Sequence, residues 1–338
     1  MDLMPGVEQV EIATTSRAFL AERAPARGRG AEHVVTDAEI DPDLWRDCAG
    51  LGWLGLGLAE DVGGVGYGLA EEIMLFRELG RSVAPGPFLP NVLGAHLAAA
   101  AGDAALAGTI VSGATRVALG TPIGQATIGA TVTADLSVVH THGARLVLVC
   151  DDGQAALVPF DGCRVVPIDP VEGSVTTGRG RATGLTAVAA VGAVSAPVFA
   201  HGLVLAAASA VGVAEAALDV AVAYAGQRVQ FGKPIGVNQA IKHWCADMAV
   251  RADGAFAQVS FAAVAVRDRL PAAATEAAIA KYAADEAARL NTEGAVQIHG
   301  AIGFTSEATP HRYVYRAHLL ARCLASRAAL LDRIVGER

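Results

Sequence analysis

Apolar residues recur at helical spacing through the first third of the chain. This pattern predicts helices at Val7–Glu22, Asp43–Gly50, Ala70–Leu79 and Val92–Ala101. Asp41-Pro42 is a start signal for the second helix, because an acidic residue and a proline both favour a helix N-terminus. The glycine-rich stretch Gly63–Gly68 predicts a loop. We therefore expect residues 1–112 to form an all-helical domain.

Short β-like runs replace the helical pattern between residues 113 and 196. The predicted strands are Thr131–Val139, Arg145–Cys150, Ala155–Phe160 and Cys163–Ile168. A turn at Asp161-Gly162 separates the last two. This rhythm predicts a small antiparallel sheet or barrel. Gly178–Gly184 has the wrong spacing and context for a dinucleotide-binding turn, so we expect a mobile loop there.

Long helical patterns return from Pro197 to Arg338. They predict helices at about Val198–Gln227, Asn238–Asp268 and Ala272–Ile298, and a fourth after Pro310. Breaks fall at Phe231–Gly236, at Pro271 and at Gly300–Gly303. Helices joined by such short loops predict an antiparallel four-helix bundle. The fold class expected for the whole chain is α+β: a helical domain, a small β domain and a bundle.

Composition and charge narrow the class of protein. Hydrophobic residues make up 53% of the chain and charged residues 18%, which supports a large core. The net charge of −8 argues against a nucleic-acid partner. The five cysteines are scattered without C-x-x-C spacing, which favours reduced thiols in a cytoplasmic protein. The N-terminal residues lack the pattern of a signal peptide.

Two further features suggest sites or partners that we do not predict. Val198–Ala223 is apolar enough to resemble a membrane span, but His201, Glu215 and Asp219 interrupt it. A buried bundle helix is therefore expected, with no membrane partner. His140 and His142 would share one face of a strand, but no Cys or carboxylate cluster is near in sequence, so no metal site is predicted.

Two motifs in the last zone carry the functional signal. The first is Arg228-Val229-Gln230-Phe231-Gly232-Lys233-Pro234-Ile235-Gly236, followed by Gln239. The second runs from Gln297 to Glu307 and reads Gln-Ile-His-Gly-Ala-Ile-Gly-Phe-Thr-Ser-Glu. Together with Gly52–Leu56, Gly63–Gly66 and Glu78–Arg81, they resemble the acyl-CoA dehydrogenase family. The offsets from Arg228 to Gln239 (239 − 228 = 11) and to Gln297 (297 − 228 = 69) are close to that family's layout.

The resemblance implies flavin adenine dinucleotide (FAD) as cofactor. The residues it implies as contacts are Arg228, Gln230, Phe231, Gln239, Gln297, Ile298, His299, Gly300 and Ala301. In the family these groups reach across a subunit interface to the neighbour's flavin, so an obligate oligomer is expected. The chemistry agrees, because a guanidinium suits phosphate oxygens and a glycine turn lets backbone approach a ligand.

Several of these residues also have an ordinary structural interpretation that needs no ligand. Arg228 alone is more typical of a charge that complements a helix C-terminus than of a phosphate contact. Gln297 alone is typical of a solvated or capping residue, and Gly300 and Gly303 of a C-cap. Only the conjunction of the spaced motifs favours flavin contacts.

The family's catalytic base is missing at its usual positions. The family reaction removes a proton from Cα of an acyl-CoA thioester and a hydride from Cβ, and the proton requires a carboxylate base. Gly202, Ser209 and Leu324 occupy the corresponding positions, and none accepts a proton usefully. His201 is a weak candidate base, and a partly buried bundle histidine is the favoured interpretation. No catalytic residue is therefore assigned.

The middle zone also departs from the family pattern. It spans only 84 residues (197 − 113), shorter than the family's β domain. The threonine and serine stretch that grips the flavin ring is not recognisable. Ala301 replaces the second glycine of the usual pair. The deficits are those expected of a chain that contributes to another subunit's flavin site without holding its own.

Three hypotheses stay open. The first is the short, non-catalytic subunit of a heteromeric, α2β2 bacterial enzyme of the steroid-CoA type. A longer acyl-CoA dehydrogenase subunit is then its partner, an acyl-CoA its substrate, and electron-transfer flavoprotein its electron acceptor. The second is a self-sufficient homotetrameric dehydrogenase with His201 or Glu307 as a relocated base. The third is a flavin-free interaction protein on the same fold.

Overall fold

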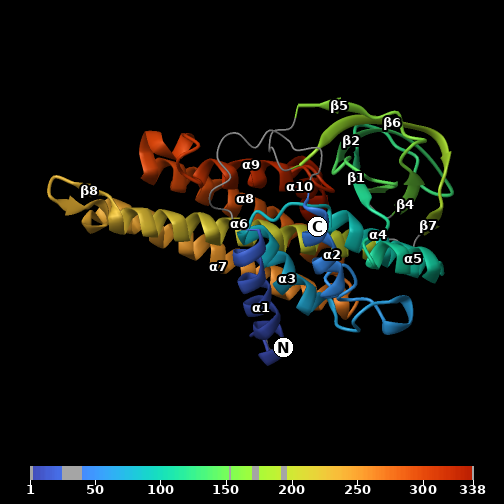
Figure 1. Cartoon of the computed structure of the whole chain (residues 1–338), viewed down its shortest axis with the longest axis horizontal. Coiled ribbons are helices and arrows are strands. Elements are labelled where there is room, and N and C mark those ends of the chain that lie inside the picture. The colour runs from blue at the N-terminus through green and yellow to red at the C-terminus, as the bar shows by residue number, and fades with distance from the viewer. Residues whose placement is uncertain (1–2, 25–39, 152–153, 170–174, 192–195, 337–338) are drawn as a thin grey trace.

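The computed structural model describes residues 3–24, 40–151, 154–169, 175–191 and 196–336, to which every structural statement below refers. Helices, then a curved sheet, then long bundle helices follow one another along the chain, and the sheet lies at one end of the elongated molecule (Figure 1). The expected α+β order is confirmed. The β8–β9 hairpin marks the opposite end of the long axis (Figure 1).

The N-terminal part is helical, as the pattern predicts. Its elements are α1 (Val7–Arg23), α2 (Pro42–Gly50), the short 3₁₀ helix η1 (Glu60–Val62), α3 (Leu69–Arg81), α4 (Phe88–Ala100) and α5 (Ala104–Val111). The side chain of Asp41 caps α2 by accepting from the backbone N–H groups of Asp43 and Leu44. The helix α5 is additional to the prediction.

The middle part forms one seven-stranded mixed sheet in the order β5-β6-β2-β1-β3-β4-β7. The strands are β1 (Val117–Pro122), β2 (Thr131–Val139), β3 (Leu146–Asp151), β4 (Gln154–Pro159), β5 (Val166–Ile168), β6 (Thr177–Thr186) and β7 (Ala189–Val191). All pairings are antiparallel except that of β1 with β3. The expected antiparallel sheet therefore contains one parallel pair.

The loop expected at Gly178–Gly184 is wrong, because this segment lies inside strand β6. Two of its three glycines face tightly packed neighbours: a Cβ added at Gly180 would lie 2.8 Å from Val138 Cγ2, and one at Gly178 would lie 2.7 Å from Val165 Cγ1. Arg179 and Arg181 alternate outward between them. Glycine here makes room for the valines without breaking the pairing of β6 with β2.

The C-terminal part is a bundle built on three long helices. Its elements are α6 (Ala196–Gln227), the hairpin strands β8 (Val229–Gln230) and β9 (Lys233–Pro234), η3 (Ile235–Val237), α7 (Gln239–Arg267), α8 (Ala273–His299), η4 (Gly300–Phe304), α9 (Pro310–Leu320) and α10 (Arg327–Gly336). The expected fourth helix is divided in two. The break contains Leu324, whose φ of 71° lies in the left-handed region.

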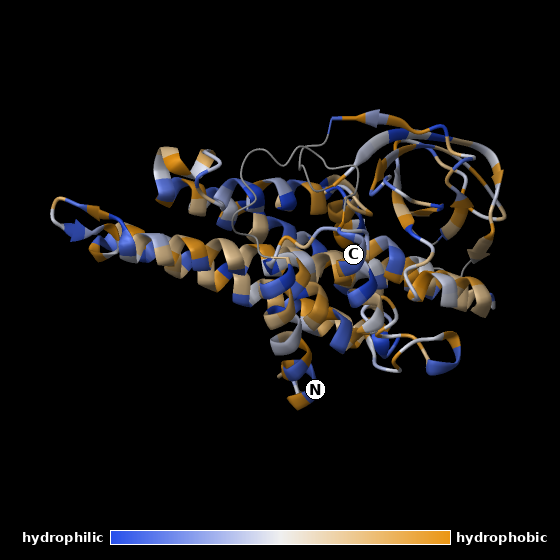
Figure 2. Ribbon diagram, in the orientation of Figure 1, coloured by the Kyte–Doolittle hydropathy of each residue, from blue (hydrophilic) through white to orange (hydrophobic). Residues whose placement is uncertain are grey.

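Two bundle helices are long and apolar enough to cross a membrane by length and composition. The apolar window of α6 is 83% buried inside the protein, whereas that of α7 is only 39% buried. The predicted burial of α6 is confirmed. Apolar and polar residues mix along the bundle helices that run toward the hairpin (Figure 2). The helix α7 thus leaves much of its surface without a cover from this chain.

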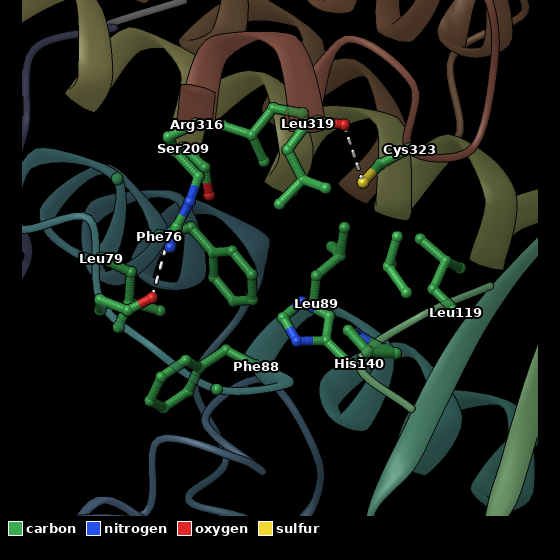
Figure 3. Close-up of a pocket in the computed structure, with 16 residues that line it drawn as sticks. Phe76, Leu79, Phe88, Leu89, Leu119, His140, Ser209, Arg316, Leu319 and Cys323 are labelled. Carbon is green, nitrogen blue, oxygen red and sulfur yellow. Dashed lines mark hydrogen bonds between the residues drawn. The ribbon is translucent and has the colours of Figure 1, made fainter. Parts of the chain in front are cut away.

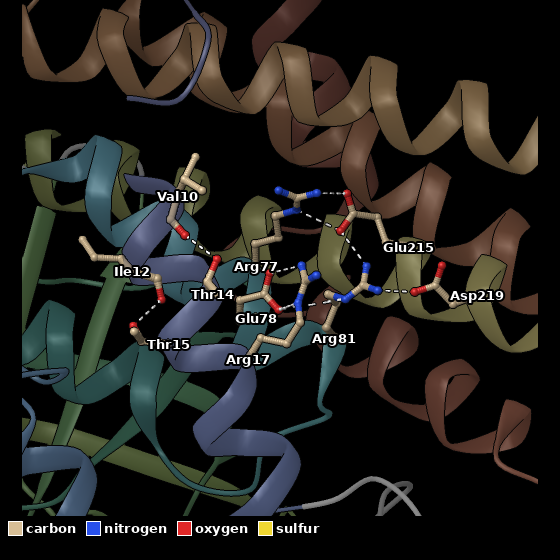
Figure 4. Close-up of polar contacts among 10 residues, drawn as sticks. All are labelled: Val10, Ile12, Thr14, Thr15, Arg17, Arg77, Glu78, Arg81, Glu215 and Asp219. Carbon is tan, nitrogen blue, oxygen red and sulfur yellow. Dashed lines mark hydrogen bonds and ion pairs between the residues drawn. The ribbon is translucent and has the colours of Figure 1, made fainter. Parts of the chain in front are cut away.

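Helices α3 and α6 cross so closely that only glycine fits at the contact. A Cβ added at Gly80 would lie 2.0 Å from the carbonyl oxygen of Ser209, and one at Gly212 would lie 1.9 Å from that of Arg77. Both Arg77, at 2.5 Å, and Arg81, at 3.1 Å, donate to the buried carboxylate of Glu215 on α6 (Figure 4). The crossing fixes the N-terminal helices against the bundle.

Candidate functional site

The predicted flavin contacts gather at the end of the bundle that carries the β8–β9 hairpin. Arg228 follows α6, Gln239 begins α7, and Gln297 lies in the last turn of α8. A small core holds these helix ends together. Its buried members are Ala217, Ala221, Ala225, Met248, Ala295 and Ile298. Ile298 therefore packs inside this end of the bundle, while its neighbours in the motif reach the surface.

Arg228 is exposed and its backbone is held in place. Its N–H donates to the carbonyl of Tyr224 and its own carbonyl accepts from the N–H of Ile235, each at 2.8 Å. Within the described residues, its guanidinium makes no ion pair or hydrogen bond with this chain. The positioned cation is thus free to meet an anion from outside the chain.

The three glutamines of the predicted set share this exposure. The side chains of Gln230, Gln239 and Gln297 carry no hydrogen bond to another described residue. Each offers a carbonyl acceptor and an amide donor. Polar groups that point outward from ordered helix ends are suited to an external polar ligand.

The hairpin between α6 and α7 presents an aromatic ring to solvent. Phe231 is fully exposed and has a φ of 53°, followed by Gly232 at 78°. A bulky residue in the left-handed region is uncommon and costs backbone energy. Two antiparallel strand pairs flank this turn, Val229 with Pro234 and Gln230 with Lys233. This pairing holds the turn in its strained conformation.

His299 is fixed by a stacking partner that sequence reasoning missed. Its ring stacks on Tyr224 of α6, with centroids 4.1 Å apart and an interplanar angle of 20°. Its Nδ1 lies 2.7 Å from the carbonyl oxygen of Ala295, and partial burial lowers its pKa, so we assign a neutral ring that donates from Nδ1. The only sequence signal for Tyr224 is its place one helical turn before Arg228.

The turn after His299 is open. Gly300 has a φ of 66°, and no heavy atom lies within 4 Å of a Cβ added there. Ala301 is exposed, so its methyl group points away from the bundle core. The space above Gly300 is therefore accessible to a molecule outside this chain.

Two of the family base positions meet in space and are both apolar. A Cβ added at Gly202 would lie 2.8 Å from Leu93 Cδ1 and 3.0 Å from Leu324 Cδ1. Leu324 is 4% exposed and Leu93 is fully buried. These two positions are 122 residues apart in sequence (324 − 202), yet they face one another across the bundle. The place where the sequence predicts the family base is therefore filled by hydrocarbon, and its assignment as the base position stays a prediction.

The third position, Ser209, borders a small cavity between α3, α4, β1 and α9 (Figure 3). The cavity measures about 50 Å³, far below the ~300–1,000 Å³ of typical ligand pockets. The lining residues with polar or sulfur-bearing side chains are Ser209, His140, Arg316 and Cys323, and the described lining contains no carboxylate. It has room for water rather than for an acyl chain.

The two candidate relocated bases lie elsewhere. The Nε2 atom of His201 is 2.6 Å from Glu72 Oε2, which engages the ring in a buried contact on a different side of α6 from Gly202. Glu307 is exposed between η4 and α9. Because α9 has 11 residues and a helix rises about 1.5 Å per residue, roughly 16 Å of helix separates Glu307 from Leu324.

The thiols behave as the sequence predicts. Burial raises the pKa of Cys48 and of Cys150 to about 12. All five cysteines are free. Such thiols stay protonated near neutral pH, and the structure offers them no nucleophilic role.

Comparison with known proteins identifies the family. The model for the acyl-CoA dehydrogenase N-terminal domain matches residues 7–115, and that for the C-terminal domain matches residues 193–331. Acyl-CoA dehydrogenase IpdE2 of Mycobacterium tuberculosis is 32% identical over 340 residues, which cover 99% of this chain and 98% of that protein. This chain belongs to the acyl-CoA dehydrogenase family. The family comprises oxidoreductases that act on CH–CH groups.

Further relatives and solved structures resemble this acyl-CoA dehydrogenase family member over most of its length. FadE34 of Mycobacterium tuberculosis is 32% identical over 93% of this chain, which spans about half (46%) of that protein's length. The solved structure titled Tcur3481-Tcur3483 steroid ACAD G363A variant has a TM-score of 0.84 and 26% identity, and 98% of this chain and 97% of that chain are covered. The ChsE4-ChsE5 complex from Mycobacterium tuberculosis shares the fold, with a TM-score of 0.85, 24% identity, and coverage of 100% and 98%.

Proposed function

We propose that this chain is a subunit of a heteromeric, flavin-dependent acyl-CoA dehydrogenase. In this proposal Arg228, Gln239 and Gln297 reach across a subunit interface to FAD held mainly by a longer partner, which also carries the catalytic base. The observation that carries the proposal is the contrast within one chain: exposed, unpaired polar groups at the hairpin end and apolar residues at the base positions.

The residues at the hairpin end fit a dinucleotide. Arg228 has no partner among the described residues and offers a planar fork for phosphate oxygens. The open space above Gly300 lets a ligand approach the backbone. Gln230, Phe231, His299 and Ala301 border the same surface, and buried Ile298 supports it from beneath. The flavin, when bound, accepts the hydride that leaves Cβ of the acyl group.

The base positions support a division of labour between two chains. Abstraction of the Cα proton needs a carboxylate within hydrogen-bond reach. Gly202 and Leu324 present only hydrocarbon to one another, and the nearby cavity is too small for an acyl-CoA. We therefore assign proton abstraction to the partner and orientation of the cofactor to this chain.

Exposed apolar residues on α7 support an assembly. Trp244 and Val250 are 43% and 72% exposed, and Val237 just before the helix is 50% exposed. Uncovered apolar surface of this kind marks protein contacts. The names of the relatives, a steroid ACAD and a two-component complex, favour an α2β2 assembly that acts on a steroid-derived acyl-CoA. We also propose a cytoplasmic location and electron-transfer flavoprotein as the acceptor.

Co-expression tests the proposal. The chain alone should be colourless and inactive, whereas the complex with a longer acyl-CoA dehydrogenase chain should be yellow and dehydrogenate an acyl-CoA. In that complex, Arg228→Ala should weaken FAD binding about 10- to 100-fold, since a hydrogen bond to a charged group contributes roughly 1.5–3 kcal/mol.

The matched control is Arg322→Ala, which removes an exposed arginine just after α9. It should leave FAD affinity unchanged. Yellow, active protein from the single chain would overturn the heteromeric proposal in favour of a self-sufficient enzyme. Unchanged flavin content in the Arg228→Ala complex would instead favour an interaction protein that has lost the cofactor role.

A further inference from the structure

Three ligating side chains converge away from the flavin-contact surface. Glu72 of α3, His96 of α4 and His201 of α6 bring one carboxylate and two imidazoles together, with all ligand atoms within 4.8 Å of one another. The Nε2 atom of His96 lies 3.0 Å from Glu72 Oε1, and that of His201 lies 2.6 Å from Glu72 Oε2. The two rings are 4.4 Å apart at their centroids.

The carboxylate of Glu72 is buried, and no lysine or arginine of the described residues pairs with it. Its side chain is 1% exposed, and its described contacts are with the two imidazoles and the N–H of Gly57, which donates to Oε1 at 3.2 Å. Both oxygens of Glu72 therefore face imidazole nitrogens, one on each ring.

The surrounding backbone is shaped around this carboxylate. A Cβ added at Gly57 would lie 2.6 Å from Glu72 Oε1, so glycine is needed to let the chain pass. The side chains of His96 and His201 are 16% and 15% exposed, so the two imidazoles are not completely sealed from solvent.

We propose that Glu72, His96 and His201 form a binding site for a divalent transition-metal ion of the zinc type. Two imidazole nitrogens and one carboxylate oxygen are the donors that zinc prefers, and three protein ligands leave a fourth position for water. In a tetrahedral site with bonds of about 2.0–2.1 Å, neighbouring donor atoms lie roughly 3.3 Å apart. The observed separations of 2.6 and 3.0 Å, each to a different oxygen of Glu72, would have to open by about 0.7 and 0.3 Å.

The ion would replace the protons that the two Nε2 atoms now direct at the carboxylate. Because the ligands come from three helices, it would tie the N-terminal helices α3 and α4 to the bundle helix α6. The site shares no residue with the flavin-contact surface. The metal proposal and the flavin proposal therefore stand or fall separately.

Metal titration of the full-length chain tests this site directly. After treatment with a chelator and its removal, the chain should bind one Zn²⁺ by calorimetry and show a raised Tm, because a ligand that binds only the folded state stabilises it. Co²⁺ in place of Zn²⁺ should give visible absorption bands of a low-coordinate site with nitrogen and oxygen ligands.

Conservative variants identify the ligands. His96→Gln and His201→Gln should each lower Zn²⁺ affinity about 100-fold or more, since loss even of an outer partner costs 10- to 100-fold. Both variants keep a group that hydrogen-bonds Glu72, and circular dichroism should show an unchanged fold. His318→Gln, which removes an exposed histidine of α9, is the control and should bind as the original chain does.

Two outcomes would overturn the site. Absence of stoichiometric Zn²⁺ binding would mean that the cluster is a hydrogen-bonded contact only. Binding that survives both His96→Gln and His201→Gln would place the metal elsewhere on the chain.

Discussion

The two ends of the α6 helix differ in what they leave uncovered. At the hairpin end, Arg228 and its neighbouring glutamines are exposed and make no side-chain bonds within the described chain. At the other end, Gly202 packs against Leu93 and Leu324, and the ion pairs of Arg77 and Arg81 with Glu215 brace the middle of the helix. One helix therefore carries a surface prepared for a ligand and a site sealed by its own core.

In the proposed function, this difference separates two functions that one active site usually combines. Ordered, exposed groups of one chain can contact a cofactor that is bound to another chain. A general base in a closed core cannot serve another chain, because it must reach the proton on the reacting carbon. The contrast between the two ends is thus a physical reason to expect a partner, and each prediction below is a way to break or sharpen it.

Placing a base at the sealed end should produce the largest effect. Leu324→Glu would bury a carboxyl group beside Leu93 and Gly202. We expect a loss of about 3–5 kcal/mol in the free energy of unfolding at pH 8, the range for an uncompensated buried charge. Urea titration monitored by circular dichroism measures it.

The pH dependence of Leu324→Glu has a definite sign. Burial raises the folded-state pKa of such a carboxyl above its unfolded value of about 4.3. The charge penalty is therefore small near pH 4 and grows as pH rises through and above that value. Leu324→Gln, which carries no charge, should lack this pH dependence. A stable Leu324→Glu chain that dehydrogenates acyl-CoA alone would mean that this end is an open active site.

A pair of glycines on α6 compares the packed middle of the helix with its hairpin end by one type of substitution. A methyl group at Gly212 would lie 1.9 Å from the carbonyl oxygen of Arg77, whereas nothing lies within 4 Å of one at Gly226. Gly212→Ala should destabilise the fold by about 3 kcal/mol through overpacking. Gly226→Ala should be neutral or stabilise by up to about 1 kcal/mol, since alanine favours helix. Equal effects in thermal unfolding would refute the contrast in packing.

The smallest expected effect concerns a single amide at the open end. Gln297→Ala in the co-expressed complex should weaken FAD binding about 5-fold, which corresponds to a neutral hydrogen bond of roughly 1 kcal/mol. The Tm of the isolated chain should not change, because this side chain bonds to no described residue. Gln125→Ala, in the exposed turn after β1, is the matched control. Fluorescence of released FAD measures both.

The sequence predicts those parts of the fold whose signals are local. The helical period and its breaks locate α6, α7 and α8 to within one or two residues. The sequence did not predict strand β6, because two of its buried positions are the glycines Gly178 and Gly180. These glycines face Val165 and Val138 but add no apolar side chains to the alternation. The pattern that predicts strands depends on side chains that glycine lacks.

The two candidate sites also differ in how far the sequence alone predicts them. The spacing of Arg228, Gln239 and Gln297 can be recognised in the sequence, so the sequence alone predicts them as flavin contacts. Their contact with flavin stays a prediction. The cluster of Glu72, His96 and His201 joins residues 24 and 129 positions apart from Glu72. No local pattern marks such a contact, since only the packing of α3, α4 and α6 creates it.

The fully exposed ring of Phe231 has a consequence for the life of the chain before assembly. Val229 beside it and Phe304 on η4 are also exposed, at 53% and 77%. A copy without a binding partner would expose these apolar side chains to other such copies. This exposure favours aggregation when the chain is made in excess of the proposed partner. For the proposed heteromeric assembly, balanced synthesis of this chain and its proposed partner would limit such aggregation.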